Sequence, residues 1–235
     1  MAACYVVAAL LAAAVPAVVA GPVIRQYIGV IGAHDSVEVT LTFDGGAVSG
    51  AYRMADGGPE GRLQGVLEAG RLELRATGAD GSPAALLTAP VPRDGLLRGQ
   101  WRAEGGERLS FYAEEVANDL PAAQSFNGHY VRQGSGSGGS LDLLLLDGDR
   151  VKAQGHASWA GPVGGAASGE VAGWAVFDGR SVRLEARPGC LLVIAPVEGG
   201  LEVSQQGRCP ANFAGRYERR SGAVPDWETF RWVGE

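Results

Sequence analysis

Apolar and polar residues alternate in short segments through most of the chain beyond residue 20. The clearest case is Val37–Phe43, which alternates with a period of two and is followed by Asp44-Gly45-Gly46. This period indicates a strand with one buried face, and Gly and Asp tolerate the backbone of a tight turn. The same pattern predicts strands at 47–54, 62–69, 71–77, 84–90, 96–103 and 107–116. Strands separated only by short turns indicate an antiparallel meander.

The pattern is interrupted at 117–125, which we interpret as an interdomain linker. Beyond it, strands are predicted at 126–133, 139–147, 150–160, 168–177, 180–187, 190–197, 200–206 and 213–220. Eight strands can close a small barrel that side chains fill. We therefore predict an all-β protein with two antiparallel meander domains, 21–116 and 126–220, each a small β-barrel of about 7–8 strands.

One phrase, F-x-G-x-Y-x-R, occurs twice, as Phe126–Arg132 and as Phe213–Arg219. We interpret the two copies as the first and last strands of one closed domain. A looser Gly-x-aromatic element also ends at Tyr52 and at Trp101. Glycine within a strand often marks a bend, and the residue two positions later points to the same face. We interpret the element as barrel curvature in which the aromatic ring fills the space beside the glycine.

The alternative is that aromatic rings of the two barrels stack on a ligand. The candidate ligand-binding residues are Tyr52, Trp101, Tyr130, Trp159, Trp174 and Tyr217.

Residues 1–20 are predicted to be a signal peptide. Positions 2–20 are apolar and uncharged, and Val18-Val19-Ala20 ends the stretch with small residues before Gly21. No Lys or Arg precedes the apolar run, so the alternative is a retained membrane anchor. Cleavage would leave a periplasmic or secreted protein without a membrane span.

Charge and cysteine content narrow the function classes. The formal net charge is −6, and Lys152 is the single lysine. Acidic and basic residues are interspersed, which argues against nucleic acid as a partner, since phosphate binding needs clustered Lys and Arg. Cys190 and Cys209 are predicted to form a disulfide, as expected for an exported chain. Two free thiols or half of a metal site are the alternatives.

Motifs for chemistry are weak. His34-Asp35-Ser36 places three triad residue types side by side, but adjacency in sequence supplies neither convergence nor an oxyanion hole. Gly134–Gly139 has no lysine and precedes a strand, so we interpret it as a hairpin loop and not as a phosphate loop. Glu114 and Glu115 should point to opposite faces of one strand. We predict no catalytic centre, metal site or cofactor.

The tail, 221–235, contains Trp227, Phe230 and Trp232. We expect these rings to pack onto a domain or to plug a barrel end. Binding to a partner is the alternative.

Two stretches resemble known bacterial proteins. Gly45–Tyr52, continuing to Leu97–Trp101, resembles a repeat in uncharacterised exported proteins and lipoproteins. Cys190–Val193, continuing through Leu201–Cys209 to Phe213–Tyr217, resembles a β-domain of periplasmic proteins, some of which are similar to or fused with lysozyme-inhibitor modules.

The resemblance implies an exported, non-enzymatic binding protein of the cell envelope, with a protein or small ligand there as its partner. An inhibitor of a cell-wall hydrolase such as lysozyme is the most specific version. A barrel that carries a small apolar ligand, or an unrecognised hydrolase, is the alternative.

Overall fold

The computed structural model describes residues 21–120, 126–134, 137–146, 149–160 and 165–222. The predicted signal peptide 1–20, residues 121–125 of the predicted linker and residues 223–235 of the tail lie outside the described residues. Among the residues described, no helix is long and apolar enough to cross a membrane.

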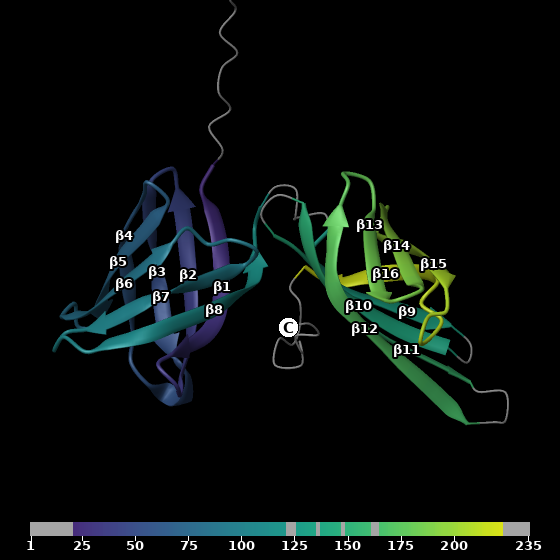
Figure 1. The fold of residues 1–235 in the computed structure, drawn as a ribbon, viewed down its shortest axis with the longest axis horizontal. Helices are drawn as coiled ribbons and strands as arrows, with labels where there is room; N and C mark the ends of the chain where they lie inside the picture. The colour runs from purple at the N-terminus through teal and green to yellow at the C-terminus, as the bar shows by residue number, and fades with distance from the viewer. Residues whose placement is uncertain (1–20, 121–125, 135–136, 147–148, 161–164, 223–235) are drawn as a thin grey trace, which may run out of the picture.

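The chain forms two closed antiparallel barrels of eight strands each, as predicted (Figure 1). The N-terminal barrel consists of β1 (Val23–Ile31), β2 (Asp35–Asp44), β3 (Ala47–Met54), β4 (Glu60–Glu68), β5 (Arg71–Gly78), β6 (Pro83–Pro90), β7 (Leu96–Ala103) and β8 (Arg108–Asn118). The C-terminal barrel consists of β9 (Gly128–Gly134), β10 (Ser137–Leu145), β11 (Arg150–Ala160), β12 (Ala166–Phe177), β13 (Val182–Arg187), β14 (Cys190–Val197), β15 (Gly200–Gly207) and β16 (Gly215–Ser221). Consecutive strands pair, and β1–β8 and β9–β16 close the two barrels.

Strand β1 was missed by the sequence pattern. Tyr27 and Ile31 point into the barrel, but Ile24 and Ile28, on the outer face, are 40% and 43% exposed. Apolar residues on both faces hide the period of two that identifies a half-buried strand. The N-terminal barrel therefore has one more strand than the seven predicted segments.

Glycines let neighbouring strands approach closely, and the aromatic residues two positions later point into the barrel cores. A Cβ added to Gly50 would lie 1.9 Å from the Thr40 carbonyl oxygen, and one added to Gly99 would lie 2.3 Å from that of Thr88. No side chain fits at those distances, so only glycine allows the strands to approach so closely. Tyr52 and Trp101, two positions after these glycines, are buried in the core. So are Tyr130 and Tyr217, two positions after the glycines of the repeated phrase. The Gly-x-aromatic element thus combines a close approach of two strands with a ring in the core, and its role in curvature stays a prediction.

The two copies of F-x-G-x-Y-x-R meet at the seam where β9 pairs with β16. In each copy the tyrosine hydroxyl donates a hydrogen bond to the carbonyl of the phenylalanine four residues earlier, at 2.7 Å for Tyr130 and 3.0 Å for Tyr217.

The arginine of each copy contacts the other copy. Arg132 donates to the carbonyl oxygens of Ala214 and Asn212, and Arg219 donates to that of Asn127. Ala214 and Asn127 occupy the same position in the phrase, so the clasp is reciprocal. The phrase therefore closes the barrel, as its position at the two ends of the domain predicts.

The disulfide is formed as predicted. The Cα atoms of Cys190 and Cys209 are 4.7 Å apart, and the bond ties the start of β14 to the loop that follows β15. From that loop Ala211 and Phe213 enter the core of the C-terminal barrel. The cross-link thus holds a segment that helps to fill the barrel.

Candidate functional site

The aromatic residues proposed as ligand contacts do not form one site. Tyr52 and Trp101 touch edge to face inside the N-terminal barrel, with ring centroids 5.4 Å apart. Tyr130 and Tyr217 lie in the core of the other barrel. Four of the six rings are therefore core residues, and burial raises the pKa of Tyr52, Tyr130 and Tyr217.

The remaining two rings, both partly buried, lie on opposite sides of the barrel wall. Trp159 packs against the core of the C-terminal barrel, whereas Trp174 lies on the outer face under two cations. The Arg150 guanidinium is 4.6 Å from the Trp174 ring centroid, and the Lys152 ammonium is 5.6 Å from it. Trp174 thus has cation–π partners from its own barrel.

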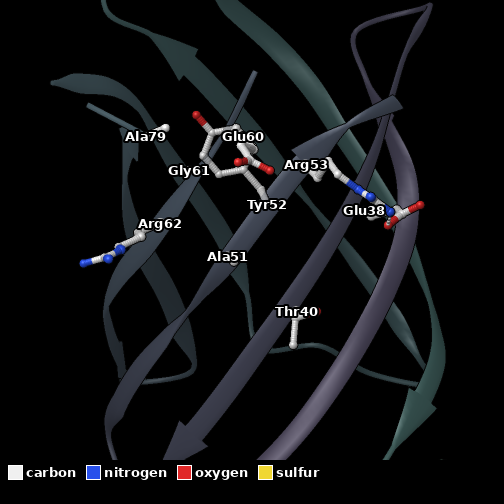
Figure 2. Close-up of a pocket in the computed structure, with 9 residues that line it drawn as sticks. All are labelled: Glu38, Thr40, Ala51, Tyr52, Arg53, Glu60, Gly61, Arg62 and Ala79. Atoms are coloured by element: carbon white, nitrogen blue, oxygen red, sulfur yellow. Dashed lines mark hydrogen bonds and ion pairs between the residues drawn. The ribbon is translucent and has the colours of Figure 1, made fainter. Parts of the chain in front are cut away.

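An open groove of about 470 Å³ lies on the outer wall of the N-terminal barrel, across β2, β3 and β4 (Figure 2). The cross-strand register places Glu38, Arg53 and Glu60 in one row. Arg62 lies in the next row, opposite Ala51. Figure 2 shows the charged side chains spread along the groove and not converging on one point.

The charges of the groove are accessible to a partner. The Arg53–Glu38 pair is 2.6 Å apart, with side chains 63% and 52% exposed, so it contributes little to stability. Tyr52 contributes to the groove floor, where Gly61 makes room for it: a Cβ there would lie 2.8 Å from the ring. The exposed charges of both signs in this groove can form hydrogen bonds and ion pairs with the polar surface of a partner.

A second open groove, of about 420 Å³, lies beside the β7–β8 hairpin, where Arg102, Glu104 and Arg108 line it. Its lining also mixes positive and negative charge. Both grooves therefore suit recognition of a polar surface better than enclosure of a small apolar molecule.

The junction between the barrels holds a set of charges that sequence reasoning missed. Lys152 of β11 is 1% exposed, and its ammonium lies 3.2 Å from a carboxylate oxygen of Glu114 in β8. The other oxygen of Glu114 accepts the Tyr112 hydroxyl at 2.5 Å. Burial lowers the pKa of Lys152, an effect that Glu114 and Glu115 oppose. For Tyr112, burial and the bond to Glu114 raise the pKa to about 12.

Glu115 points to the opposite face of β8, as expected from its position beside Glu114. It is fully buried and lies 3.3 Å from the Arg25 guanidinium. Asn118 donates both to Glu115, at 2.6 Å, and to the Leu145 carbonyl of the other barrel, at 2.9 Å. The Leu145 amide in turn donates to Asn127 at 2.6 Å. This chain of bonds fixes the two barrels to each other where the connecting segment leaves β8 and enters β9.

Two sequence features could have revealed this junction. One is the chain's single lysine, placed in a strand between Val151 and Ala153. The other is the unbroken leucine run at the end of β10 and just after it. Leu144 and Leu146 fall outside the inward alternation of this run, yet each is 1% exposed. A Cβ added to Gly95 of the N-terminal barrel would lie 2.9 Å from Leu146, so the outward side of this run packs against the other barrel.

His34 and His129 lie in different barrels. His34 lies in the exposed turn between β1 and β2, next to Asp35 and Ser36, which are also exposed. His129 lies 2.7 Å from Asp142, whose other oxygen accepts Gln154 at 2.9 Å. This pair lies on the outer wall of the C-terminal barrel and not in either groove. Within the described ranges, no group of three His, Cys, Asp or Glu residues is placed to hold a metal ion.

The chain matches no family model, no curated protein and no solved structure.

Proposed function

We propose that this protein is an exported, non-enzymatic binding protein of the cell envelope, and that it recognises its partner on the outside of its barrels. The observation that carries the proposal is the filling of both interiors. In each barrel the inward side chains form a single packed cluster of buried residues. A carrier of a small apolar ligand needs a hollow barrel, so this packing disfavours that alternative.

Three further observations support an exported binding protein. Disulfides persist in oxidising compartments, and the Cys190–Cys209 pair has the geometry of one. The net charge of −6 is compatible with a basic partner. The groove across β2–β4 presents Glu38 and Glu60 on a rigid wall, where carboxylates can meet such a partner.

A cell-wall hydrolase such as a lysozyme is the partner that we propose. Its support is the resemblance of the stretch from Cys190 to Tyr217 to β-domains associated with lysozyme-inhibitor modules. An unrecognised hydrolase is disfavoured because the polar groups of the grooves do not converge on a reacting centre.

The test is inhibition of animal lysozymes of three types, chicken, goose and invertebrate, by oxidised protein comprising residues 21–235. We expect stoichiometric slowing of cell-wall lysis by at least one type. In the groove variant Glu38→Lys/Glu60→Lys, the inhibition constant should rise about ten-fold or more, since losing interfacial charge pairs costs affinity. A control, Glu68→Lys/Glu73→Lys, makes the same charge change at exposed positions of the same barrel outside the groove. Its inhibition constant should stay within about two-fold of the unmodified protein's.

If none of the three lysozymes is slowed, the inhibitor function is wrong. If both variants lose inhibition equally, the partner responds to net charge and the groove is not its site.

A further inference from the structure

Three arginines lie in one row on the outer wall of the N-terminal barrel, where β5, β6, β7 and β8 are successive neighbours (Figure 1). Arg75 of β5 lies opposite Leu86 of β6, which in turn lies opposite Arg102 of β7. Arg102 lies opposite Arg108 of β8. All three arginines are exposed. Strand register therefore gathers positive charge on one part of a chain whose net charge is −6.

The facing pair, Arg102 and Arg108, has no counter-charge within the protein. Like charges directly opposite each other on neighbouring strands destabilise a sheet. Among the residues that the structure describes, neither guanidinium forms an ion pair or a hydrogen bond, and the same holds for Arg75. Glu104 lies in the adjoining hairpin but is not paired with either arginine. Two facing guanidinium groups without an internal partner are suited to hold an external anion.

A groove lies where the two arginines meet. The open groove of about 420 Å³ beside the β7–β8 hairpin is lined by Arg102 and Arg108, and also by Leu86. Most of its remaining lining is small, and none of the described residues that line it is aromatic. The groove thus combines two cations with an apolar side chain at their side.

These surroundings disfavour two kinds of polymer. Proteins that bind single-stranded nucleic acid stack the bases on aromatic side chains, which this groove lacks. An extended peptide often binds by adding a strand to an open sheet edge. No such edge exists here, because β6 and β7 are each paired with a neighbour on both sides.

We propose that this row binds a saccharide that carries two phosphate groups. A phosphate monoester carries about two negative charges at neutral pH, which match the two guanidinium groups of Arg102 and Arg108. Directly opposed residues have Cβ atoms about 5 Å apart, so both planar forks can reach the oxygens of one phosphate. This pair therefore holds the first phosphate.

The rest of the row fits the sugar and its second phosphate. Leu86 lies between Arg102 and Arg75, and its side chain can contact the C–H groups of a sugar ring. Two strand spacings of about 4.8 Å separate β5 from β7, so the backbones at Arg75 and Arg102 lie about 10 Å apart. Long flexible arginine side chains span the remaining distance to phosphates at the two ends of one sugar ring. Arg75 therefore holds the second phosphate.

Isothermal titration calorimetry of oxidised protein 21–235 tests the proposal. The probes are glucose 1,6-bisphosphate, glucose 6-phosphate, inorganic phosphate and glucose. The bisphosphate should bind about ten-fold or more tightly than inorganic phosphate, since it adds a second charge-assisted contact and the contact with Leu86. Glucose 6-phosphate should lie between the two, and glucose should not bind.

Arginine variants test which residues hold which phosphate. Arg102→Gln/Arg108→Gln should weaken binding of the bisphosphate about ten-fold or more. Arg75→Gln should weaken binding of the bisphosphate but leave that of glucose 6-phosphate within about two-fold, because it removes the second contact alone. The control Arg71→Gln/Arg93→Gln removes two exposed arginines outside the groove and should leave both affinities within about two-fold.

Two further variants separate a binding role from a structural one. The carboxylate of Glu104, which lines the groove, repels phosphate, so Glu104→Gln should tighten binding about two-fold. Arg102→Gln removes one of two facing like charges, so it should raise the melting temperature of the protein without ligand.

Equal affinity for inorganic phosphate and the bisphosphate would overturn the proposal. So would an equal loss of binding in the control variant, or a lower melting temperature for Arg102→Gln. Binding to vesicles of phosphatidylcholine and phosphatidylglycerol without binding to either sugar phosphate would assign the arginines to a lipid surface, which also contradicts it. None of these results bears on the Glu38–Glu60 groove, which shares no lining residue with this one.

Discussion

Removing the carboxylate of Glu114 should destabilise the protein much more than removing its partner Lys152. Lys152 is 1% exposed, so Glu114→Gln leaves an ammonium group buried beside a neutral side chain. Breaking a buried ion pair in this way costs about 3–5 kcal/mol. Because the carboxylate of Glu115 also acts on Lys152, we expect the lower end, about 3 kcal/mol.

The reverse change leaves a carboxylate that water can reach. The Glu114 side chain is 18% exposed and keeps its hydrogen bond from Tyr112. In Lys152→Met, the new side chain can still pack on the Trp174 ring. We therefore expect a cost of about 1 kcal/mol. The double variant Glu114→Gln/Lys152→Met should resemble Lys152→Met, which gives a coupling energy of about 3 kcal/mol.

Urea denaturation provides the assay. Unfolding is followed by tryptophan fluorescence, since Trp174 lies beside Lys152, and by far-UV circular dichroism for both barrels together. Equal costs for the two single variants, or a double variant equal to their sum, would refute a buried and coupled pair at the junction.

Two further predictions concern the barrel wall and alkaline pH. Gly50→Ala should cost about 1–3 kcal/mol in urea denaturation, because the new Cβ would meet the Thr40 carbonyl at 1.9 Å, whereas Gly46→Ala, with its nearest atom at 3.6 Å, should cost about 0.5 kcal/mol or less; equal costs would contradict the curvature role. The pKa of Tyr112 is raised from 10.0 to about 12 in the folded protein, so the stability linked to it is present below pH 10 and is lost as pH rises from 10 to 12. Tyr112→Phe should weaken the fall in unfolding free energy across that range, and an unchanged pH profile would contradict the assignment.

The sequence was sufficient to predict strands whose two faces meet different surroundings. Val37–Phe43 alternates because its inner face fills the barrel and its outer face meets water. The repeated phrase F-x-G-x-Y-x-R also located the closing strands. In both copies the tyrosine is buried and bonds to the carbonyl of the phenylalanine, and the two copies lie on the two strands that close the barrel.

Sequence reasoning failed where a strand carries apolar residues on its outer face, or where its outer face contacts the other barrel. β1 was missed because Ile24 and Ile28 lie outward. Lys152 lies on the outer face of the C-terminal barrel, and this face is buried only because the N-terminal barrel packs against it. The groove was missed for a related reason: Glu38, Arg53 and Glu60 are brought into one row by strand register, and register follows from pairing across the whole barrel.

The claim that recognition takes place outside two filled barrels is tested most directly by native mass spectrometry of oxidised protein purified from a bacterial envelope. The account predicts the mass of the polypeptide alone, with no small molecule released on denaturation. A small apolar molecule that co-purifies at one equivalent per chain and leaves on denaturation would contradict it.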